Sequence, residues 1–272
     1  MTKNKKMIAI DLDGTLLRSD STLSAYTIDT LKKISSQGHQ IIISTGRPFR
    51  MALPFYKELG LTGPMITFNG ALTHIPGQKW NFEHSVRIDR DILLDVLKVQ
   101  DDFEMDFVAS EYKDKVFLSY QDRSTINPAL FGLEAITDAM TLEISKITSD
   151  PNALLMQTRN RDKYQIADTL KSYLNNQVEV DSWGGPLNIL EMAPKGVHKA
   201  YALDYLLRTL NRDPQDLIAF GDEHNDTEML AYAGTGYAMK NANPLLLPFA
   251  KEQTNWTNDE DGVARTLEAL FL

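Results

Sequence analysis

Short apolar runs alternate with amphipathic stretches over the first 70 positions of the chain. Residues 7–10 (MIAI) and 40–44 (QIIIS) are compact runs of strand-forming residues, and residues 65–68 form a third. Between the first two runs, residues 24–36 carry apolar side chains at helical spacing, and Gly38 follows as a stop signal. This strand–helix–strand–helix–strand order predicts a parallel sheet with helices packed on its faces.

Proline and glycine mark the ends of two further elements in this region. A helix is expected to begin near Pro48 and to stop at Gly60. Pro54 interrupts it, so we expect either a kink or a late start. Asn69-Gly70 is a turn signal that leads from the third strand into the apolar run ALTHI.

The middle of the chain has a different pattern, with longer alternating strands and few short buried ones. We predict four strands and two helices here: strands over 103–109, 115–120, 178–181 and 187–191, and helices over 89–99 and 162–174. Residues 111–114 would join the first two strands, and Gly184-Gly185-Pro186 would join the last two. We interpret residues 84–190 as an inserted α+β domain, which leaves 1–83 and 191–272 as the core domain.

The opening pattern returns after the insert. An amphipathic helix is expected over 197–210, a buried strand over 216–220 and a helix around Met229 and Leu230. A strand over 236–239, a short helix near Pro244 and a final helix over 261–270 complete the predicted elements.

Composition excludes several classes of function. The chain has 272 residues, a formal net charge of −9 and no cysteine. The charge argues against general nucleic-acid binding, and the lack of cysteine excludes disulfides, zinc thiolates and thiol nucleophiles. We see no signal peptide and no apolar run of membrane-spanning length, so we expect a cytoplasmic protein, either a monomer or a homodimer, with no membrane partner.

The first strand ends in a carboxylate pair, Asp11-Leu12-Asp13-Gly14-Thr15. In extended geometry Asp11 and Asp13 would crowd together, whereas a turn at Gly14 would fold Asp13 back over Asp11. Neighbouring carboxylates repel, and Mg²⁺, which takes oxygen ligands, would relieve that repulsion. A solvated turn explains this stretch equally well, but an EF-hand loop does not, because Leu16 stands where that loop needs glycine.

Two other strands of the predicted sheet also end in polar clusters. Ser44 and Thr45 follow the second strand, and Asp222, Asn225 and Asp226 follow the strand over 216–220. Parallel strands bring their carboxyl ends to one edge, where ligands bind in such sheets. The convergence therefore favours a functional site.

Each member of this set also has a purely structural interpretation. Thr45 could simply cap a helix, and Asp222 and Asp226 could be capping acids. Lys199, near the start of the helix before the last cluster, could lie on the surface. His224 reads more simply as an incidental loop residue than as a ligand or base.

Phosphoryl transfer is the chemistry that best fits carboxylates, a hydroxyl and a lysine around one point. A carboxylate can attack phosphorus, while a metal ion and lysine and threonine donors neutralise and hold the phosphoryl oxygens. A metal and Lys199 would also supply positive charge in an acidic protein. The other histidines lack metal-ligand spacing, and no GxSxG, P-loop or HExxH motif occurs.

With these residues in place, the sequence resembles the haloacid dehalogenase superfamily of phosphatases, and most of all its Cof-type branch with a C2 cap. Four family motifs occur in order: DxDGT at Asp11–Thr15, the threonine of STGR at Thr45, the lysine of GVxK at Lys199, and GDxxND at Gly221–Asp226. Asn69-Gly70 and the stretch 258–264 (NDEDGVA) are also similar. His198 stands where a small residue is more usual, and Lys195 is a less fitting alternative to Lys199.

The resemblance implies a Rossmann-like α/β core with a parallel sheet and an inserted α+β cap that selects the substrate. It implies that Asp11 is the nucleophile and Asp13 the acid/base. By the same resemblance, Mg²⁺ would be held by the carboxylates of Asp11 and Asp222 and the backbone carbonyl of Asp13, with Asp226 in support. The phosphoryl oxygens would be bound by Thr45, the amide of Gly46, Asn225 and Lys199, and Arg47 would add positive charge.

We therefore predict a Mg²⁺-dependent phosphatase of small phosphate monoesters that works through an aspartyl phosphate. Sugar phosphates are the first expectation for the substrate, and flavin or pyridoxal phosphates come next. A phosphosugar mutase on the same scaffold is the nearest alternative. A phospho-accepting regulator of the receiver type, or a catalytically silent one, is a further alternative, although a receiver would have neither its acceptor on the first strand nor a large insert.

Overall fold

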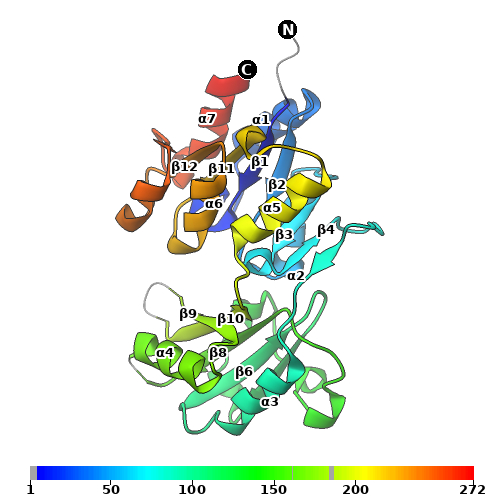
Figure 1. Cartoon of the computed structure of the whole chain (residues 1–272), viewed down its shortest axis with the longest axis vertical. Helices are drawn as coiled ribbons and strands as arrows, with labels where there is room; N and C mark the ends of the chain where they lie inside the picture. The colour runs from blue at the N-terminus through cyan, green and yellow to red at the C-terminus, as the bar shows by residue number, and fades with distance from the viewer. Residues whose placement is uncertain (1–4, 161, 184–186) are drawn as a thin grey trace. The chain divides into compact units, whose positions relative to one another are not determined.

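A computed structural model describes residues 5–160, 162–183 and 187–272, which form two compact units (Figure 1). The first unit is drawn from the chain up to Arg47, from Ala52–His84 and from His198–Leu272. The second contains Pro48–Met51 and Ser85–Val197. The domain limits expected from the sequence stay a prediction, and the limit at 190/191 falls inside a strand, β10 (Ile189–Pro194).

A five-stranded parallel sheet forms the centre of the first unit, in the order β13-β12-β11-β1-β2. Its strands are β1 (Met7–Ile10), β2 (Gln40–Ile43), β11 (Leu217–Gly221), β12 (Thr235–Ala238) and β13 (Glu252–Gln253). All residues of β1 and β11 are buried, as their continuous apolar sequences require for central strands of a parallel sheet. The predicted α/β class is confirmed.

The register of the sheet brings three strand ends to one level. Ile10 pairs with Ile43 on one side and with Phe220 on the other. The residues that follow these strands, Asp11 and Ser44 among them, therefore leave the sheet at the same carboxyl edge.

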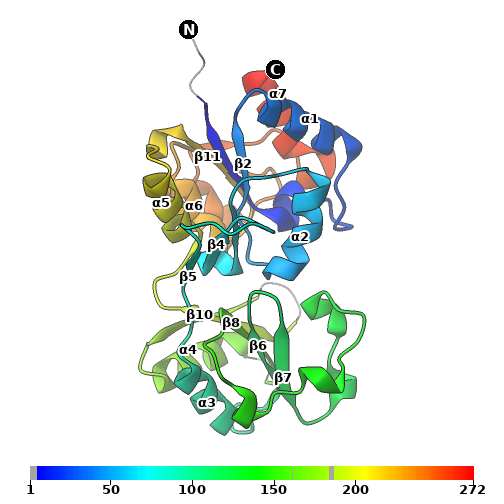
Figure 2. The same ribbon diagram turned by 90° about the vertical axis from the view of Figure 1, so that its right-hand side faces the viewer.

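Helices cover both faces of the parallel sheet. They are α1 (Ala25–Ser36), α2 (Phe49–Glu58), α5 (Lys199–Thr209), α6 (Thr227–Tyr232) and α7 (Gly262–Phe271). Helices α1 and α7 lie together on one side, and α5 and α6 lie together on the other (Figure 2). α5 and α6 bury Leu203, Leu206 and Met229 against the sheet residues Ala9 and Ile42. The helices expected in this unit are confirmed, and α2 begins without delay and contains Pro54.

The third strand departs from the prediction in its pairing. β3 (Met65–Thr67) lies antiparallel to β4 (Leu72–His74), and both belong to a separate sheet with β5 (His84–Ser85). Its link to the parallel sheet is an isolated bridge between Ile66 and Ser44. The apolar pattern identified the strand but could not choose its partner, because the Asn69-Gly70 turn sends the chain straight back along β3.

The second unit is built on an antiparallel sheet in the order β7-β6-β8-β10-β9. Besides β10, its strands are β6 (Met105–Glu111), β7 (Val116–Tyr120), β8 (Ala153–Thr158) and β9 (Val178–Ser182), and its helices are α3 (Arg90–Lys98) and α4 (Lys163–Tyr173). The predicted α+β character, both helices and both strand pairs are confirmed. The central strand β8 was missed, and the predicted turn at Gly184-Gly185-Pro186 lies outside the described residues.

Several short helical turns connect these elements in the first unit. Those nearest the carboxyl edge of the parallel sheet cover Leu12–Leu16, Phe68–Gly70, His224–Asp226, Pro244–Phe249 and Asn258–Glu260. None of the described helices combines the length and apolar character needed to span a lipid bilayer.

Candidate active site

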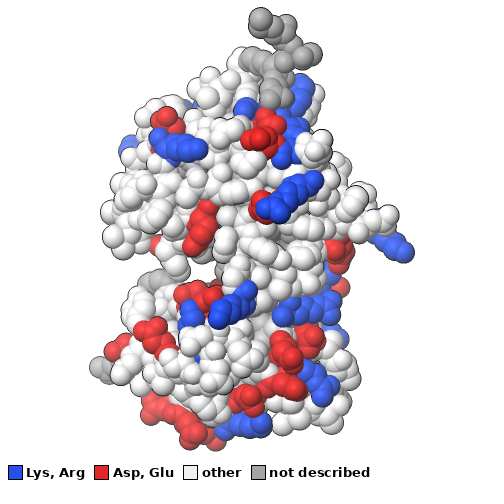
Figure 3. Space-filling view, viewed as in Figure 1, with Lys and Arg blue, Asp and Glu red and all other residues white. Residues whose placement is uncertain are grey.

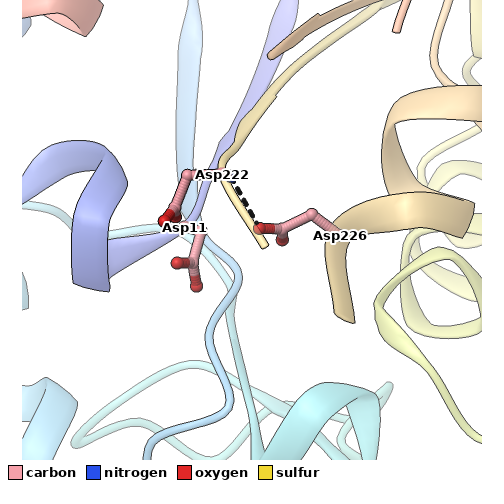
Figure 4. A group of neighbouring side chains, drawn as sticks. All are labelled: Asp11, Asp222 and Asp226. Carbon is pink, nitrogen blue, oxygen red and sulfur yellow. Dashed lines mark hydrogen bonds between the residues drawn. The ribbon is translucent and has the colours of Figure 1, made fainter. Parts of the chain in front are cut away.

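Three carboxylates meet at the carboxyl edge of the parallel sheet. Asp11 follows β1, Asp222 follows β11, and Asp226 lies where α6 begins (Figure 4). One oxygen from each can be chosen so that all three lie within 4.8 Å of one another. The structure therefore brings together three acids that the sequence predicted to meet at this edge of the sheet.

Lys199 lies in the middle of this acidic group. Its side chain has no exposed surface, and Nζ donates to Oδ1 of Asp11 at 2.7 Å and to Oδ1 of Asp226 at 2.6 Å. The surface interpretation of this lysine is wrong. α5 begins at Lys199, and the preceding His198 caps the helix by accepting the N–H of Tyr201 through Nδ1 at 3.2 Å.

Burial makes the acidic group electrostatically strained. It raises the pKa of Asp11 well above its ordinary value, although Lys199 opposes the shift. It also raises the pKa of Asp222 to about 7, against the hydrogen bond from Thr15. Burial opposes the charge on Lys199 too, but the carboxylates of Asp11 and Asp226 raise its pKa all the same.

One buried lysine cannot balance three carboxylates. The site therefore favours a further cation, and its all-oxygen donor set is the kind that Mg²⁺ prefers. The cation of this group, Lys199, has no exposed surface. On the face of the molecule that Figure 3 shows, acidic and basic side chains are interspersed.

Both carboxylate oxygens of Asp226 are engaged by the protein. Oδ1 accepts from Lys199, and Oδ2 accepts the backbone N–H groups of Asp222 at 3.0 Å and Glu223 at 3.3 Å. The capping interpretation is thus partly correct for Asp226, which closes the turn His224–Asp226. The same contacts hold the loop that carries Asp222.

Asp13 lies apart from the buried carboxylates. The chain turns tightly after Asp11, and the side chain of Asp13 is 57% exposed. It accepts from Nε of Arg47 at 2.7 Å and from Nη2 of the same guanidinium. The chain turns here as the second alternative expected, but the carboxyl of Asp13 pairs with Arg47 and is not part of the group that Asp11 forms with Asp222 and Asp226.

The remaining predicted site residues surround the same edge. Thr45 is buried, and its Oγ1 accepts the N–H of Arg47 at 3.1 Å. Because α2 begins only at Phe49, Thr45 is not the cap of that helix. Asn225 donates from Nδ2 to Oδ1 of Asn69 at 3.0 Å, and the Asn69 carboxamide lies directly against Gly46.

Four residues at this edge were not assigned from the sequence. Thr15 donates to Oδ1 of Asp222 at 2.7 Å, and Asn69 contacts Asn225. Asn241 donates to the carbonyl of Gly14 at 2.8 Å, and Asn243 donates through its backbone N–H to the carbonyl of Asp222 at 2.8 Å. Asn241 and Asn243 follow β12 of the same sheet, so the edge argument would have found them had it been extended to that strand.

Buried carboxylates around a buried lysine at the carboxyl edge of a parallel sheet are suited to phosphoryl transfer. The sequence profile described as haloacid dehalogenase-like hydrolase matches residues 8–267. The chain therefore belongs to the haloacid dehalogenase-like hydrolases, and it is a phosphatase of that family acting on small phosphorylated metabolites.

Relatives of known name agree with this assignment. The chain is 32% identical to the 5-amino-6-(5-phospho-D-ribitylamino)uracil phosphatase YitU of Bacillus subtilis, over 97% of each chain. It is 26% identical to the HMP-PP phosphatase of Yersinia enterocolitica, over 97% of this chain and 94% of that one. A crystal structure of a haloacid dehalogenase-like hydrolase from Bacteroides thetaiotaomicron superposes with a TM-score of 0.85 at 25% identity, over 98% and 100% of the two chains. The predicted family, fold and enzyme class are confirmed.

Proposed function

We propose that the protein is a Mg²⁺-dependent phosphomonoesterase that works through an aspartyl phosphate on Asp11. The observation that carries this proposal is the fully buried Lys199, which bridges Asp11 and Asp226 beside Asp222. A buried ammonium group held by carboxylates at the carboxyl edge of a parallel sheet is suited to balance the negative charge of a phosphoryl group.

The residues divide the reaction between them. A carboxylate oxygen of Asp11 attacks phosphorus, the bond from phosphorus to the ester oxygen breaks, and Asp13 gives its proton to the leaving alcohol. Asp13 then takes a proton from water as the water oxygen attacks phosphorus. The bond from phosphorus to the Asp11 oxygen breaks, which releases orthophosphate and restores the Asp11 carboxylate. The carboxyl of Asp13 is outside the Lys199 cluster and 57% exposed, which supports this role. Both of its oxygens accept from Arg47, so an alcohol or water would reach it by replacing one of those hydrogen bonds.

The phosphoryl oxygens would be bound by the hydroxyl of Thr45, the amide of Gly46, Asn225 and Lys199. Mg²⁺ would be held by the carboxylates of Asp11 and Asp222 and the backbone carbonyl of Asp13. Bound there, it would offset the charge repulsion between the anionic ester and Asp11. Asp226 would support the site through Lys199 and the Asp222 backbone, since both of its oxygens already have those partners.

For the substrate we propose a small monoester in which the phosphate is carried by a sugar or polyol chain. The support is the name of the 32% identical relative, whose substrate bears a phosphoribityl group. Sugar phosphates stay the first choice, with flavin and pyridoxal phosphates next. A panel of these esters and the relative's named substrate, assayed for orthophosphate release, would rank them. Conversion of a sugar phosphate to an isomer without orthophosphate would instead identify a mutase.

The decisive variant is Asp11→Asn, which keeps the shape of the side chain but removes the attacking carboxylate. We expect turnover of para-nitrophenyl phosphate with Mg²⁺ to fall by at least about 1,000-fold, as for other nucleophile replacements. Asp114→Asn, an exposed carboxyl in the second unit, is the control and should retain wild-type turnover. Unreduced turnover in a folded Asp11→Asn protein would contradict the aspartyl-phosphate mechanism.

A further inference from the structure

The turn that ends β3 has an unusual backbone. Phe68, Asn69 and Gly70 all have positive φ angles, of +53°, +52° and +106°. A residue with a side chain is destabilised in this conformation by roughly 1–2 kcal/mol, and asparagine tolerates it better than phenylalanine. Consecutive residues of this kind occur where the surrounding structure imposes them, and such sites are often functional.

The contacts of Asn69 show what this conformation achieves. Its backbone N–H donates to the carbonyl of Thr45 at 3.1 Å, which ties the turn to the loop after β2. Its side-chain Oδ1 accepts from Nδ2 of Asn225 at 3.0 Å, which ties the same residue to the loop after β11. One residue from outside the four family motifs thus connects two of the loops that carry them.

The carboxamide of Asn69 also fits closely against Gly46. A Cβ atom placed on Gly46 would lie 3.0 Å from Oδ1 and 3.1 Å from Nδ2 of Asn69, closer than ordinary packing allows. The lack of a side chain at position 46 therefore lets the Asn69 carboxamide lie beside the Gly46 backbone. The backbone amide of Gly46 and the side chain of Asn225 are two of the groups proposed above to bind phosphoryl oxygens.

We propose that Asn69 is a positioning residue that orients Asn225 and the Thr45–Gly46 backbone for binding the phosphoryl group. The proposal rests on the proposed function, because it assigns a supporting residue to that same site. Asn69 acts through its neighbours, so its loss should weaken phosphate binding while Asp11 and Lys199 stay in place.

The test compares orthophosphate binding in variants at position 69. Asn69→Gly keeps the left-handed backbone accessible and removes only the carboxamide. We expect the inhibition constant of orthophosphate, and KM for para-nitrophenyl phosphate, to rise about 10-fold, the lower end of the effect of removing an outer residue that orients site groups. Asn69→Asp should raise both further, because its negative charge lies near the bound anion. Titration calorimetry with orthophosphate and Mg²⁺ gives the binding change independently of turnover.

The control is Asn211→Ala. Asn211 is an exposed asparagine with a φ of +51° that follows α5, so this variant carries the backbone penalty of losing a left-handed asparagine. It should bind orthophosphate as the wild type does. Asn69→Ala carries the same backbone penalty. Comparing orthophosphate binding by Asn69→Ala and Asn211→Ala therefore separates the loss of the Asn69 carboxamide from a general loss of stability.

A double-mutant cycle with Asn225→Ala tests the route of the effect. If Asn69 acts by orienting Asn225, adding Asn69→Gly to Asn225→Ala should weaken phosphate binding much less than it does alone. Fully additive losses, or a folded Asn69→Gly protein with wild-type orthophosphate binding, would overturn the positioning role. The Asp11→Asn variant keeps the two proposals distinguishable. If Asp11→Asn retains turnover, the aspartyl-phosphate mechanism fails. If Asp11→Asn is inactive and Asn69→Gly binds orthophosphate as the wild type does, only the role of Asn69 is refuted.

Discussion

Gly14 brings the turn that carries Asp13 into direct contact with Asp222. Its φ is +67°, and a Cβ atom at this position would lie 2.2 Å from Oδ2 of Asp222. An alanine here would therefore meet two difficulties, the left-handed backbone and a carboxylate that already accepts from Thr15. The second difficulty acts on the site itself.

We expect Gly14→Ala to lower kcat/KM by about 100-fold, the effect of misplacing catalytic groups by about 1 Å. Gly77→Ala is a matched control, because Gly77 has a φ of +72° and no atom within 4 Å of the added Cβ. Both variants should lose about 1–2 kcal/mol of unfolding free energy from the backbone. Equal kcat/KM in the two proteins would show that the contact with Asp222 does not matter.

At the scale of residues, the sequence identified groups whose placement follows from strand order. Asp11, Asp222 and Asp226 could be brought together because parallel strands end at one edge. The bridging contacts of Lys199 could not be predicted, since they depend on how α5 packs on the sheet. Asn69 was seen only as a turn residue, because its contact with Asn225 joins positions 156 residues apart.

At the scale of elements, strong local patterns and the two hairpin pairs were predicted correctly, whereas the partner of β3 was not. The central strand β8 was missed because ALLMQT is a short apolar run without alternation, which a strand and a buried helix share. β6 begins two residues later than expected and extends to Glu111. Its end is marked by an ion pair that no local pattern shows, between Glu111 and Arg50 in the first turn of α2.

The Arg50–Glu111 pair is well shielded from water within the second unit. The side chains are 17% and 4% exposed, and both guanidinium Nη atoms donate to the carboxylate, at 2.6 and 2.9 Å. Burial raises the pKa of Glu111 above its ordinary value of 4.5, while Arg50 opposes that shift. Without Arg50 the pKa would rise further, because only the burial effect would remain.

We expect Arg50→Met to lower the unfolding free energy by about 3 kcal/mol at pH 8, the lower end for breaking a buried pair. In this variant the folded protein would hold the Glu111 proton more tightly than the unfolded chain does. The loss of unfolding free energy should therefore be smaller at pH 5 than at pH 8, because the folded carboxyl is ionised to a greater extent at the higher pH. Denaturant unfolding at pH 5 and pH 8 measures it.

Two controls bear on this expectation. Arg123→Met breaks an exposed pair with Asp138 in the same unit and should cost no more than about 1 kcal/mol. The double variant Arg50→Met with Glu111→Leu should recover most of the loss, because no charge is left buried. A loss independent of pH would mean that packing of the arginine stem, and not the stranded carboxylate, is responsible.

At the scale of the whole molecule, every residue predicted for the site lies in the first unit. Asp11, Asp13, Thr45 and Gly46 come before the second unit in the chain, and Lys199, Asp222, Asn225 and Asp226 come after it. The sequence showed this division as a change of pattern, from short buried strands to longer alternating ones and back. The family resemblance implies that the second unit selects the substrate, but the sequence did not show which of its side chains would do so, because strand patterns give the face of a residue and not its neighbours.

This division predicts where a bound metal should stabilise the chain. A ligand that binds only the folded form of one unit raises the free energy of opening that unit, and hydrogen exchange reports the change segment by segment. With Mg²⁺ in place of EDTA, we expect slower exchange in peptides covering residues 7–17 and 217–232, where the carboxylates are carried. Residues 105–120 and 153–158, which include strands β6, β7 and β8 of the second unit, should exchange as before.

Asp222→Asn is the matched control for the exchange experiment, because it removes one proposed ligand carboxylate while Lys199 keeps both of its partners. In that variant Mg²⁺ should leave the exchange of residues 7–17 unchanged. Equal protection of both units in the wild type would mean that they open together, so that the second unit contributes to the metal-bound state. The pKa values of Asp11 and Asp222 are raised, so ionisation of these carboxyls is unfavourable until a cation binds beside them. No protection in either unit, at Mg²⁺ concentrations that support turnover, would therefore contradict a metal site at the carboxyl edge of the sheet.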